Sequence, residues 1–288
     1  MMTSHEPRLI AVGDNCLDVS LTKGTMTVGG NALNVAVQWK LNGWNGRYFG
    51  AVADDPEGEA VLEAIAPTGL AREDVEIRTG DTAVTLLKDE AGDRRFLLEQ
   101  LGVGADYIPD EARYNDLLAA DWVHLGTHAD ERLVRRLVAD GVRFSVDVSL
   151  AHFAFSLEGV PLVLASGPDD PDIPAEPLIE ALRRAGARQV LMTCGARGAF
   201  FHDGDKLSFA PALEIDVVDT CGAGDSFMAS FLTSRFFRDT DAEAALREAA
   251  VKAAATCMYP GGFPQPVLPI PDWLLTKYAG IIRQVEEV

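Results

Sequence analysis

Short apolar runs alternate with amphipathic segments along most of this 288-residue chain. The apolar runs are only four to six residues long, the length of buried strands. They are Leu9–Gly13, Tyr48–Val52, Trp122–Leu125, Arg143–Val148, Leu162–Ala165 and Val190–Thr193. Segments with helical spacing of apolar residues separate several of them, at Ala32–Leu41, Pro56–Ala66, Asp130–Ala139 and Glu176–Ala185. This alternation predicts an α/β fold in which helices cover both faces of a mostly parallel sheet.

Two regions depart from the alternation. Thr82–Leu87 and Arg94–Leu98 flank a turn at Glu90–Asp93, which predicts a β-hairpin. From Ser226 to the end of the chain, helical patterns dominate.

Composition and charge exclude several classes of function. The chain is 48% hydrophobic and 24% charged, which is typical of a globular protein, and it has no apolar run long enough for a membrane span. Residues 1–7 are polar and do not resemble a secretory signal. The four cysteines are widely spaced, which favours a reducing cytoplasm: Cys16, Cys194, Cys221 and Cys257. A net charge of −19 opposes binding to nucleic acid and to anionic membranes.

The segment Asp219–Asp225 carries the strongest indication of chemistry. It follows a strand-like run, Leu213–Val218, and precedes an amphipathic helix expected at Ser226–Phe237. Small residues at positions 222–224 would let backbone amides at a helix N-terminus approach an anion. The carboxylate of Asp225 at the same place is explained if it accepts a proton from a group that attacks the anion. The segment therefore indicates phosphoryl transfer to a hydroxyl.

A second polar group of residues lies near the N-terminus. Asp14 follows the first strand and could accept hydrogen bonds from sugar hydroxyls, or simply cap a turn. Gly29 and Gly30 permit close backbone approach, Asn31 could cap the following helix, and Asn34 lies one turn further on the same side. Such a set suits a hydroxyl-rich ligand.

Both segments resemble the signature motifs of the ribokinase-like (PfkB) carbohydrate kinases, through Asp219–Asp225, Gly13–Asp18 and Val28–Ala36. The resemblance implies one ribokinase-like domain over residues 1–288, a three-layer α/β/α fold with a mostly parallel central sheet and a small β lid. The lid strands would lie roughly at 16–28 and 82–99. It further implies Asp225 as catalytic base, with Gly222, Ala223 and Gly224 as the anion hole, and substrate contacts from Asp14, Gly29, Gly30, Asn31 and Asn34.

The resemblance also implies a nucleotide site. ATP would be bound by a glycine-containing loop after an apolar strand and by small residues elsewhere, namely Thr193, Gly195, Gly198, Asp219 and Ala254. Ala254 lies in an alanine-rich segment, Ala242–Met258, where ordinary helix packing explains the small side chains equally well.

One segment departs from the family pattern. Where the family carries Asn-x-x-Glu, this chain has Ser166-Gly167-Pro168-Asp169. Asp169 could still order magnesium-bound water, so Mg²⁺ is expected together with ATP. A monovalent cation such as K⁺ is left open.

Within the family, the chain looks most like the fructoselysine 6-kinase branch, through Gly13–Val19, Val123–His128 and Asp147–Ser149. That branch phosphorylates the 6-hydroxyl of a sugar bearing an amino-acid substituent. His124, at a strand end, is then expected to contact substrate, and a metal pair with His128 is disfavoured because helical i, i+4 geometry is not expected. Arg95 could meet a substrate carboxylate, or be a solvated hairpin charge.

The expected partners are therefore a sugar, ATP and a second copy of the chain. A lid sheet with an uncovered apolar face would favour a homodimer joined lid to lid. Two alternatives stay open: a kinase of the same family acting on another sugar, sugar acid or nucleoside, and a regulatory protein that binds sugar or nucleotide with impaired catalysis.

Overall fold

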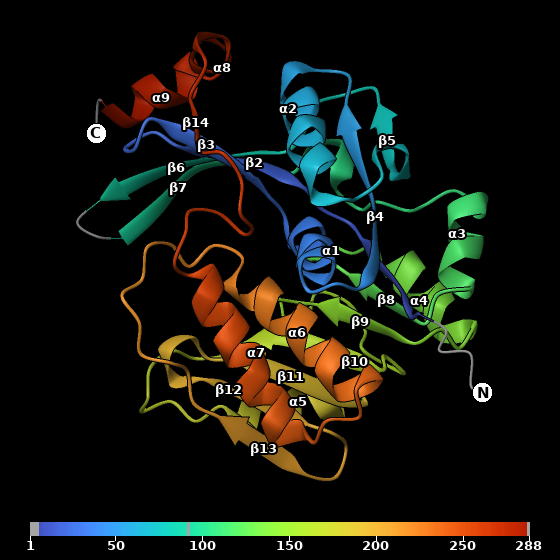
Figure 1. Ribbon diagram of the computed structural model, residues 1–288. Coiled ribbons are helices and arrows are strands. Elements are labelled where there is room, and N and C mark those ends of the chain that lie inside the picture. Colours follow the sequence, from blue (N-terminus) through green and yellow to red (C-terminus); the bar gives the residue numbers. More distant parts are fainter. Residues whose placement is uncertain (1–5, 91–92, 287–288) are drawn as a thin grey trace.

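A large sheet forms the centre of the molecule. The computed structural model describes residues 6–90 and 93–286, and within them nine strands form this sheet in the order β13-β12-β11-β10-β9-β8-β1-β4-β5 (Figure 1). Their bounds, in that order, are Leu207–Ala210, Ala199–His202, Gln189–Thr193, Leu162–Ser166, Phe144–Asp147, Trp122–Leu125, Arg8–Val12, Asn45–Ala53 and Val75–Arg78. The strands from β11 to β5 are parallel, and β12 and β13 continue the sheet antiparallel. The predicted α/β class is confirmed.

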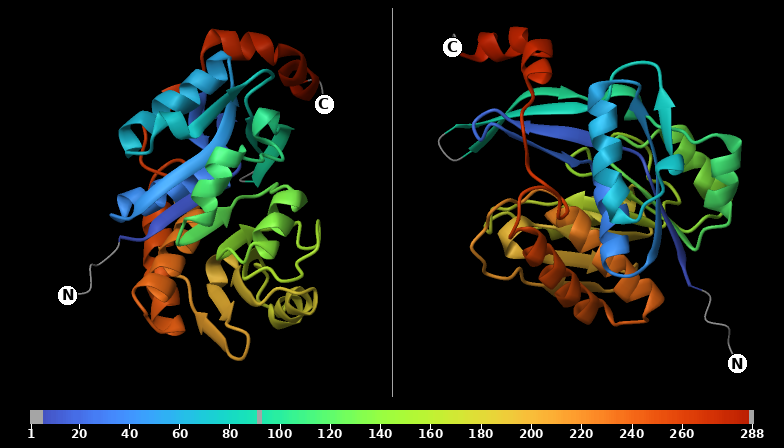
Figure 2. Two further views of the ribbon diagram at one scale, coloured as in Figure 1. Left: turned by 90° about the vertical axis from the view of Figure 1, so that its right-hand side faces the viewer. Right: turned by 45° about the horizontal axis from the view of Figure 1, so that its top comes forward.

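Helices cover both faces of this sheet. One side carries α1 (Asn31–Leu41), α2 (Pro56–Ile65), α6 (Ala223–Phe237) and α7 (Ala242–Thr256); the other carries α3 (Glu111–Leu118), α4 (Glu131–Ala139) and α5 (Glu176–Arg184) (Figures 1 and 2). The helices predicted from periodicity are present, with ends shifted by at most three residues. The short helix α3 was not expected.

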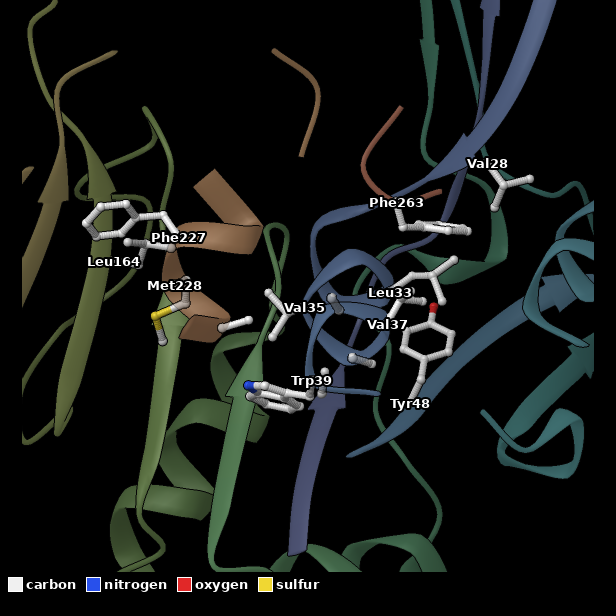
Figure 3. Packing of buried hydrophobic residues seen from close by; sticks show 14 of the residues in the cluster. Val28, Leu33, Val35, Val37, Trp39, Tyr48, Leu164, Phe227, Met228 and Phe263 are labelled. Atoms are coloured by element: carbon white, nitrogen blue, oxygen red, sulfur yellow. The ribbon is translucent and has the colours of Figure 1, made fainter. Parts of the chain in front are cut away.

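The two apolar cores follow from the alternation of side chains along each strand. In β1, Leu9 and Ala11 join the core with α1 and α6, whereas Ile10 and Val12 join the core with α3, α4 and α5. Figure 3 shows the first core, in which Val35 of α1 faces Met228 of α6. A strand that buries both faces must be apolar throughout, which is why the strands could be found from sequence.

A second, smaller sheet lies over one end of the first, in the order β14-β3-β2-β6-β7 (Figure 2). The strands, in that order, are Leu268–Pro269, Thr25–Gly29, Cys16–Ser20, Val84–Glu90 and Asp93–Gln100. The expected hairpin is present, since β6 pairs antiparallel with β7, and β2 and β3 match the expected lid segment. Residues 91 and 92 of the expected turn lie outside the described residues. We refer to this sheet as the lid.

One face of the lid is apolar and packed within the chain. Leu17, Val19 and Leu86 are buried in the same cluster as Tyr278, which precedes α9 (Ala279–Glu286) and follows α8 (Asp272–Lys277). The Tyr278 hydroxyl contacts Gln100 Oε1 at 3.4 Å, which ties this C-terminal segment to β7. The apolar surface that motivated the lid-to-lid homodimer is thus covered on this side, and the homodimer stays a prediction.

The strand expected at Leu213–Val218 is wrong. Residues 211–222 contain no regular strand, and Val218 is 54% exposed. The amide of Val218 donates to the carbonyl of Cys257 at the end of α7, so no neighbouring strand pairs with this segment. The helix expected from Ser226 begins earlier, at Ala223.

None of the helices in the described part of the chain has the length and apolar character that a bilayer span requires.

Candidate active site

A pocket of about 270 Å³ separates the lid from the carboxyl end of β1. Asp14 and Thr127 line it from the large sheet, Asp18 and Thr85 from the lid, and Cys221 from the turn before α6. Polar side chains from the ends of parallel strands meet here because all those strands end at the same edge of the sheet. The pocket is therefore the natural place for a polar ligand.

The turn before α6 is held in a shape that only glycine accommodates at position 222. Gly222 has φ 71°, and a Cβ there would lie 2.3 Å from the Cα of Gly262. Asp219 fixes the turn from both sides, since one carboxylate oxygen accepts from the amide of Cys221 at 2.9 Å and the other from Gly261 at 3.1 Å. Asp219 therefore holds the turn in place through hydrogen bonds to backbone amides.

This turn leaves backbone donors available at the start of α6. Ala223 donates to the carbonyl of Thr220, and Ser226 donates to that of Gly222. The amides of Gly224 and Asp225 have no acceptor in the described part of the chain. A Cβ on Gly224 would meet nothing within 4 Å, so Gly224 borders open space. Open donors at a helix N-terminus form an anion site.

Asp225 lies beside this anion site and is held by two amides. Asn31 Nδ2 donates to Oδ1 at 2.6 Å, and Asn34 Nδ2 donates to Oδ2 at 2.7 Å. Burial raises the pKa of Asp225 well above its ordinary value; the two asparagines oppose this rise, and the nearby Asp147 and Asp14 add to it. A carboxylate with a raised pKa is a stronger base than an exposed aspartate.

Asn31 occupies the centre of the site rather than capping α1. The N-cap residue is Gly30, with φ 111°, and the first amides of the helix donate to the Asp14 carboxylate, from Asn31 at 2.7 Å and from Ala32 at 3.3 Å. The side chain of Asn31 is thereby available to bridge Asp225 and Asp147, the latter at 2.7 Å. The expected cap role of Asn31 is wrong, and Asp14 takes it.

Asp147 is a site residue that the sequence analysis did not assign. It ends β9, is buried, and accepts from the Ser149 amide at 2.6 Å as well as from Asn31. Burial raises its pKa to about 7. The signal was present, because Asp147 ends an apolar strand just as Asp14 follows one.

His124 lies behind the site and not in the pocket. Its side chain is 0% exposed, with Nε2 3.2 Å from Asn31 Oδ1 and Nδ1 2.9 Å from Ser145 Oγ. Burial lowers its pKa to about 3, so the ring is neutral at ordinary pH. The expected contact of His124 with substrate would have to pass through Asn31.

Two glycines bring the lid close to α1. A Cβ on Gly30 would lie 2.4 Å from the Cα of Asn15, and one on Gly29 would lie 2.8 Å from Asp18 Oδ2. Asp18 lines the pocket, and Cys221 Sγ donates to its Oδ2 at 3.9 Å across the cleft. Asp18 was not among the predicted site residues, although its alternation with Cys16 and Ser20 on β2 places it on the polar face.

Arg95 lies on the exposed part of the lid hairpin. It is paired with Lys88 across β6 and β7 and is not among the residues that line the pocket.

The expected nucleotide residues lie at the far end of the large sheet. Thr193 ends β11, and Gly195 and Gly198 follow it with φ of 50° and 116°. A Cβ on Gly195 would lie 2.4 Å from Asp169 Oδ1, so the two expected nucleotide and metal loops are in contact. Arg197 Nη1 fixes this arrangement by donating to three carbonyls of the 168–173 loop.

Ala254 lies half-buried on α7, near the loop that precedes the anion site. Val218 and Asp219 in that loop donate to the carbonyl of Cys257, which ends α7. Val218 and Met258 are each more than half exposed, which makes an apolar surface beside Ala254.

Comparison with known proteins places this geometry in a family. The model of the pfkB family carbohydrate kinases matches residues 8–141 and 168–267. Among curated relatives, fructosamine kinase FrlD of Bacillus subtilis is 32% identical over 264 residues, which cover 89% of this chain and 93% of the relative. The fructoselysine 6-kinase of Escherichia coli is 31% identical over 237 residues, covering 78% and 87%.

Solved structures show the same fold. The ribokinase of Arabidopsis thaliana, solved in complex with ribose and ATP, has a TM-score of 0.78 at 20% identity and covers 95% of this chain and 98% of its own. The three-layer ribokinase-like architecture expected from sequence is confirmed. The matched family model spans most of the chain, including the Asp14, Asn31 and Asp225 segments, and the chain belongs to the pfkB family of carbohydrate kinases.

Proposed function

We propose that this kinase transfers the γ-phosphoryl group of ATP to a primary hydroxyl of a sugar, with Asp225 as the general base. The observation that carries the proposal is the position of Asp225. Its carboxylate stands at the N-terminus of α6, next to amides that have no acceptor among the described residues, and is joined to α1 through Asn31 and Asn34. A base is thus held beside an anion site, which is what proton removal during phosphoryl transfer requires.

The proton of the attacking hydroxyl passes to the Asp225 carboxylate. Burial raises the pKa of Asp225, which brings its basicity closer to what proton transfer near neutral pH needs. The amides of Gly224 and Asp225 stabilise the charge that develops on the transferring group, whereas the Ala223 amide already donates to Thr220. In a chain with net charge −19, these backbone dipoles are the local source of attraction for phosphate.

The residues present fit Mg²⁺ as a companion of the nucleotide. No group of three or more possible metal-ligating side chains (His, Cys, Asp or Glu) occurs among the described residues. Mg²⁺ bound with a nucleotide needs only one or two carboxylates in addition to phosphates and water. Asp169, packed against Gly195 in the nucleotide loop, supplies one. When bound, the ion would neutralise phosphate charge.

For the substrate, we propose fructoselysine or a related glycated amino acid, phosphorylated at the 6-hydroxyl. Two relatives that act on such compounds align over most of this chain. The pocket has a polar end at Asp14 and Asp18 for sugar hydroxyls, and its lid end carries both signs of charge, Lys23 and Glu99. A substituent with an ammonium and a carboxylate group would be matched by that pair.

We propose that the protein works in a reducing cytoplasm. The four cysteines, which form no disulfide bond in the structure, support this location.

The test of the base is the Asp225→Asn variant. Removing a general base is expected to lower kcat by roughly 10²–10⁴-fold, while calorimetry still detects sugar binding. Near-normal turnover by the variant would refute the role of Asp225.

The test of the substrate is an ADP-release screen across sugars with and without amino-acid substituents. The proposal expects glycated amino acids to give the highest kcat/KM. A preference for ribose, fructose or a nucleoside would favour the first alternative. The alternative of a binding protein without catalysis is motivated by Ser166–Asp169, and ADP formed together with any phosphorylated sugar would exclude it.

A further inference from the structure

Behind Asp225 lies a continuous chain of buried hydrogen bonds that the proposed reaction does not use. It runs from Trp122 on β8 through Ser145 on β9 and His124 on β8 to Asn31 on α1. From Asn31 it reaches both Asp225 and Asp147. Trp122 is 3% exposed, and Ser145 and His124 are 0% exposed, so bulk water does not reach these three side chains.

The direction of every bond in this chain is determined by its two ends. At one end, Trp122 Nε1 can only donate, and it lies 3.0 Å from Ser145 Oγ. At the other end, Asp225 and Asp147 can only accept once they are ionised, and both hydrogens of Asn31 Nδ2 are then committed to them at 2.6 and 2.7 Å. Asn31 Oδ1 must therefore be the acceptor toward His124.

His124 is consequently left with one tautomer. Its Nε2 must carry the proton, because it faces the Asn31 carbonyl oxygen at 3.2 Å. Its Nδ1 must accept from the Ser145 hydroxyl at 2.9 Å, whose oxygen already accepts from Trp122. If the Asn31 amide were flipped, its oxygen would face two carboxylates. The low pKa of His124, caused by burial, keeps the ring neutral and compatible with this arrangement.

We propose that His124 is a positioning residue, which as the Nε2–H tautomer fixes the Asn31 amide so that it donates to Asp225. This inference rests on the proposed role of Asp225 as base. Without the donor at Nε2, Asn31 Oδ1 loses its hydrogen-bond partner, so the amide is held only through its nitrogen. The hydrogen bond from Asn31 that stabilises the ionised form of Asp225 is then weakened.

The expected consequence is a change in the pH dependence of the reaction. The titratable groups around Asp225 are Asp14, which follows β1, Asp147 from β9, and His124 through Asn31. Weakening the hydrogen bond from Asn31 should raise the pKa of Asp225 further. Because activity requires the ionised form, the acidic limb of the kcat/KM profile moves to higher pH. A rise of about one pH unit lowers activity about tenfold below the limb.

The kinetic test compares three variants at one position. His124→Leu removes the donor and is expected to shift the acidic limb by about one unit upward, with KM for ATP unchanged. His124→Gln places an amide nitrogen near the position of Nε2 and should keep the limb within about 0.3 unit of the original protein. His124→Asn places its nitrogen near Nδ1 and should behave like Leu. His202→Leu is the matched control, since His202 is also buried and hydrogen-bonded through both ring nitrogens but lies on β12.

The proposal would be overturned if the acidic limb of the kcat/KM profile did not move in a folded His124→Leu variant. It would also be overturned if the Gln and Asn variants had the same pH profile. If the His124→Leu variant does not fold, the comparison of the Gln and Asn variants still tests the proposal, because both retain a polar side chain.

A second measurement does not depend on activity. Nitrogen-15 NMR of the imidazole rings in the original protein, assigned with His124→Gln, reports which nitrogen carries the proton. We expect the neutral Nε2–H form in the range above the Asp147 pKa of about 7, where the carboxylates next to Asn31 are ionised. The Nδ1–H form or a protonated ring in that range would overturn the inference. If no sugar is phosphorylated, the proposed function fails while this result still decides the tautomer.

Discussion

The part of the site around Asp225, here called the acceptor end, and the part around Gly195 and Gly198, here called the nucleotide end, are built in different ways. At the acceptor end, buried and half-buried side chains from α1, β9 and α6 hold one another, and Asp225 has both carboxylate oxygens bonded. At the nucleotide end, the expected contacts are backbone turns at Gly195 and Gly198 and an exposed loop with Val218 on its surface.

The difference indicates which part of the site is held rigidly by side-chain hydrogen bonds. A general base must be held within a few tenths of an ångström of its reacting group, and a buried hydrogen-bond network achieves this before substrate arrives. A nucleotide is bound through its many phosphate oxygens, for which backbone amides suffice. The comparison therefore predicts that substitutions at the acceptor end change kcat and stability, whereas those at the nucleotide end change KM for ATP.

After Asp225→Asn, the largest effect is expected at Gly222, in the turn before α6. Gly222→Ala forces a Cβ into the Gly262 backbone and a left-handed φ on alanine, so the turn must shift and its amides with it. The value of kcat/KM should fall roughly 10²–10³-fold. Gly224→Ala is the matched control for stability, because a Cβ there meets nothing within 4 Å. Thermal unfolding and steady-state kinetics of both variants check this, and equal stability of the two would contradict it.

The next effect concerns Asp147 and the stability of the acceptor end. Its folded pKa of about 7 lies above the ordinary value of 3.8, so the folded state binds more protons between these values. Its contribution to stability is present at low pH and is lost as pH rises through 7. Asp147→Asn removes this dependence, so between pH 4 and 7 the original protein should lose roughly 1–4 kcal/mol more than the variant. Urea unfolding across that range measures the difference, and parallel curves would speak against a raised pKa.

A smaller effect, confined to ATP, is expected at Gly195. Alanine there would adopt φ 50° and displace the Asp169 carboxylate. We expect KM for ATP to rise about tenfold with little change in KM for the sugar. Gly204→Ala is the control, since Gly204 also has positive φ but a Cβ would lie 3.6 Å from its nearest neighbour, Arg188 O, in the β12–β13 turn. A rise in the sugar KM instead would break the division between the two ends.

The smallest effect is expected at Ala254. Ala254→Leu adds bulk on the half-buried side of α7 beside the expected adenine position. The affinity for ATP should fall about fivefold, or about 1 kcal/mol, with kcat preserved. Calorimetric titration with ATP measures it, and an unchanged affinity would place the nucleotide base elsewhere.

Much of the fold could be predicted from sequence because its strands are buried on both faces. Such strands are apolar throughout, and the glycines and carboxylate of residues 219–225 have few other uses together. The same reasoning failed at Leu213–Val218, where alternating apolar residues lie exposed in a loop. That pattern is typical of a strand only if a neighbour is available to pair with it. The covering of the lid by the C-terminal helices was missed for a similar reason, since the chain does not encode locally which surface a terminal helix will meet.

The sequence by itself determined the alternation of strands and helices, the glycine turn and the presence of a carboxylate where α6 begins. Only the tertiary structure brought Asn31, Asp147 and His124 to that carboxylate. His124 and Ser145 face each other because β8 and β9 pair in that register, and Asn31 reaches Asp225 because α1 packs against α6. Periodicity along a chain records which side of an element is buried, but the distance between two side chains more than a hundred residues apart depends on how whole elements pack.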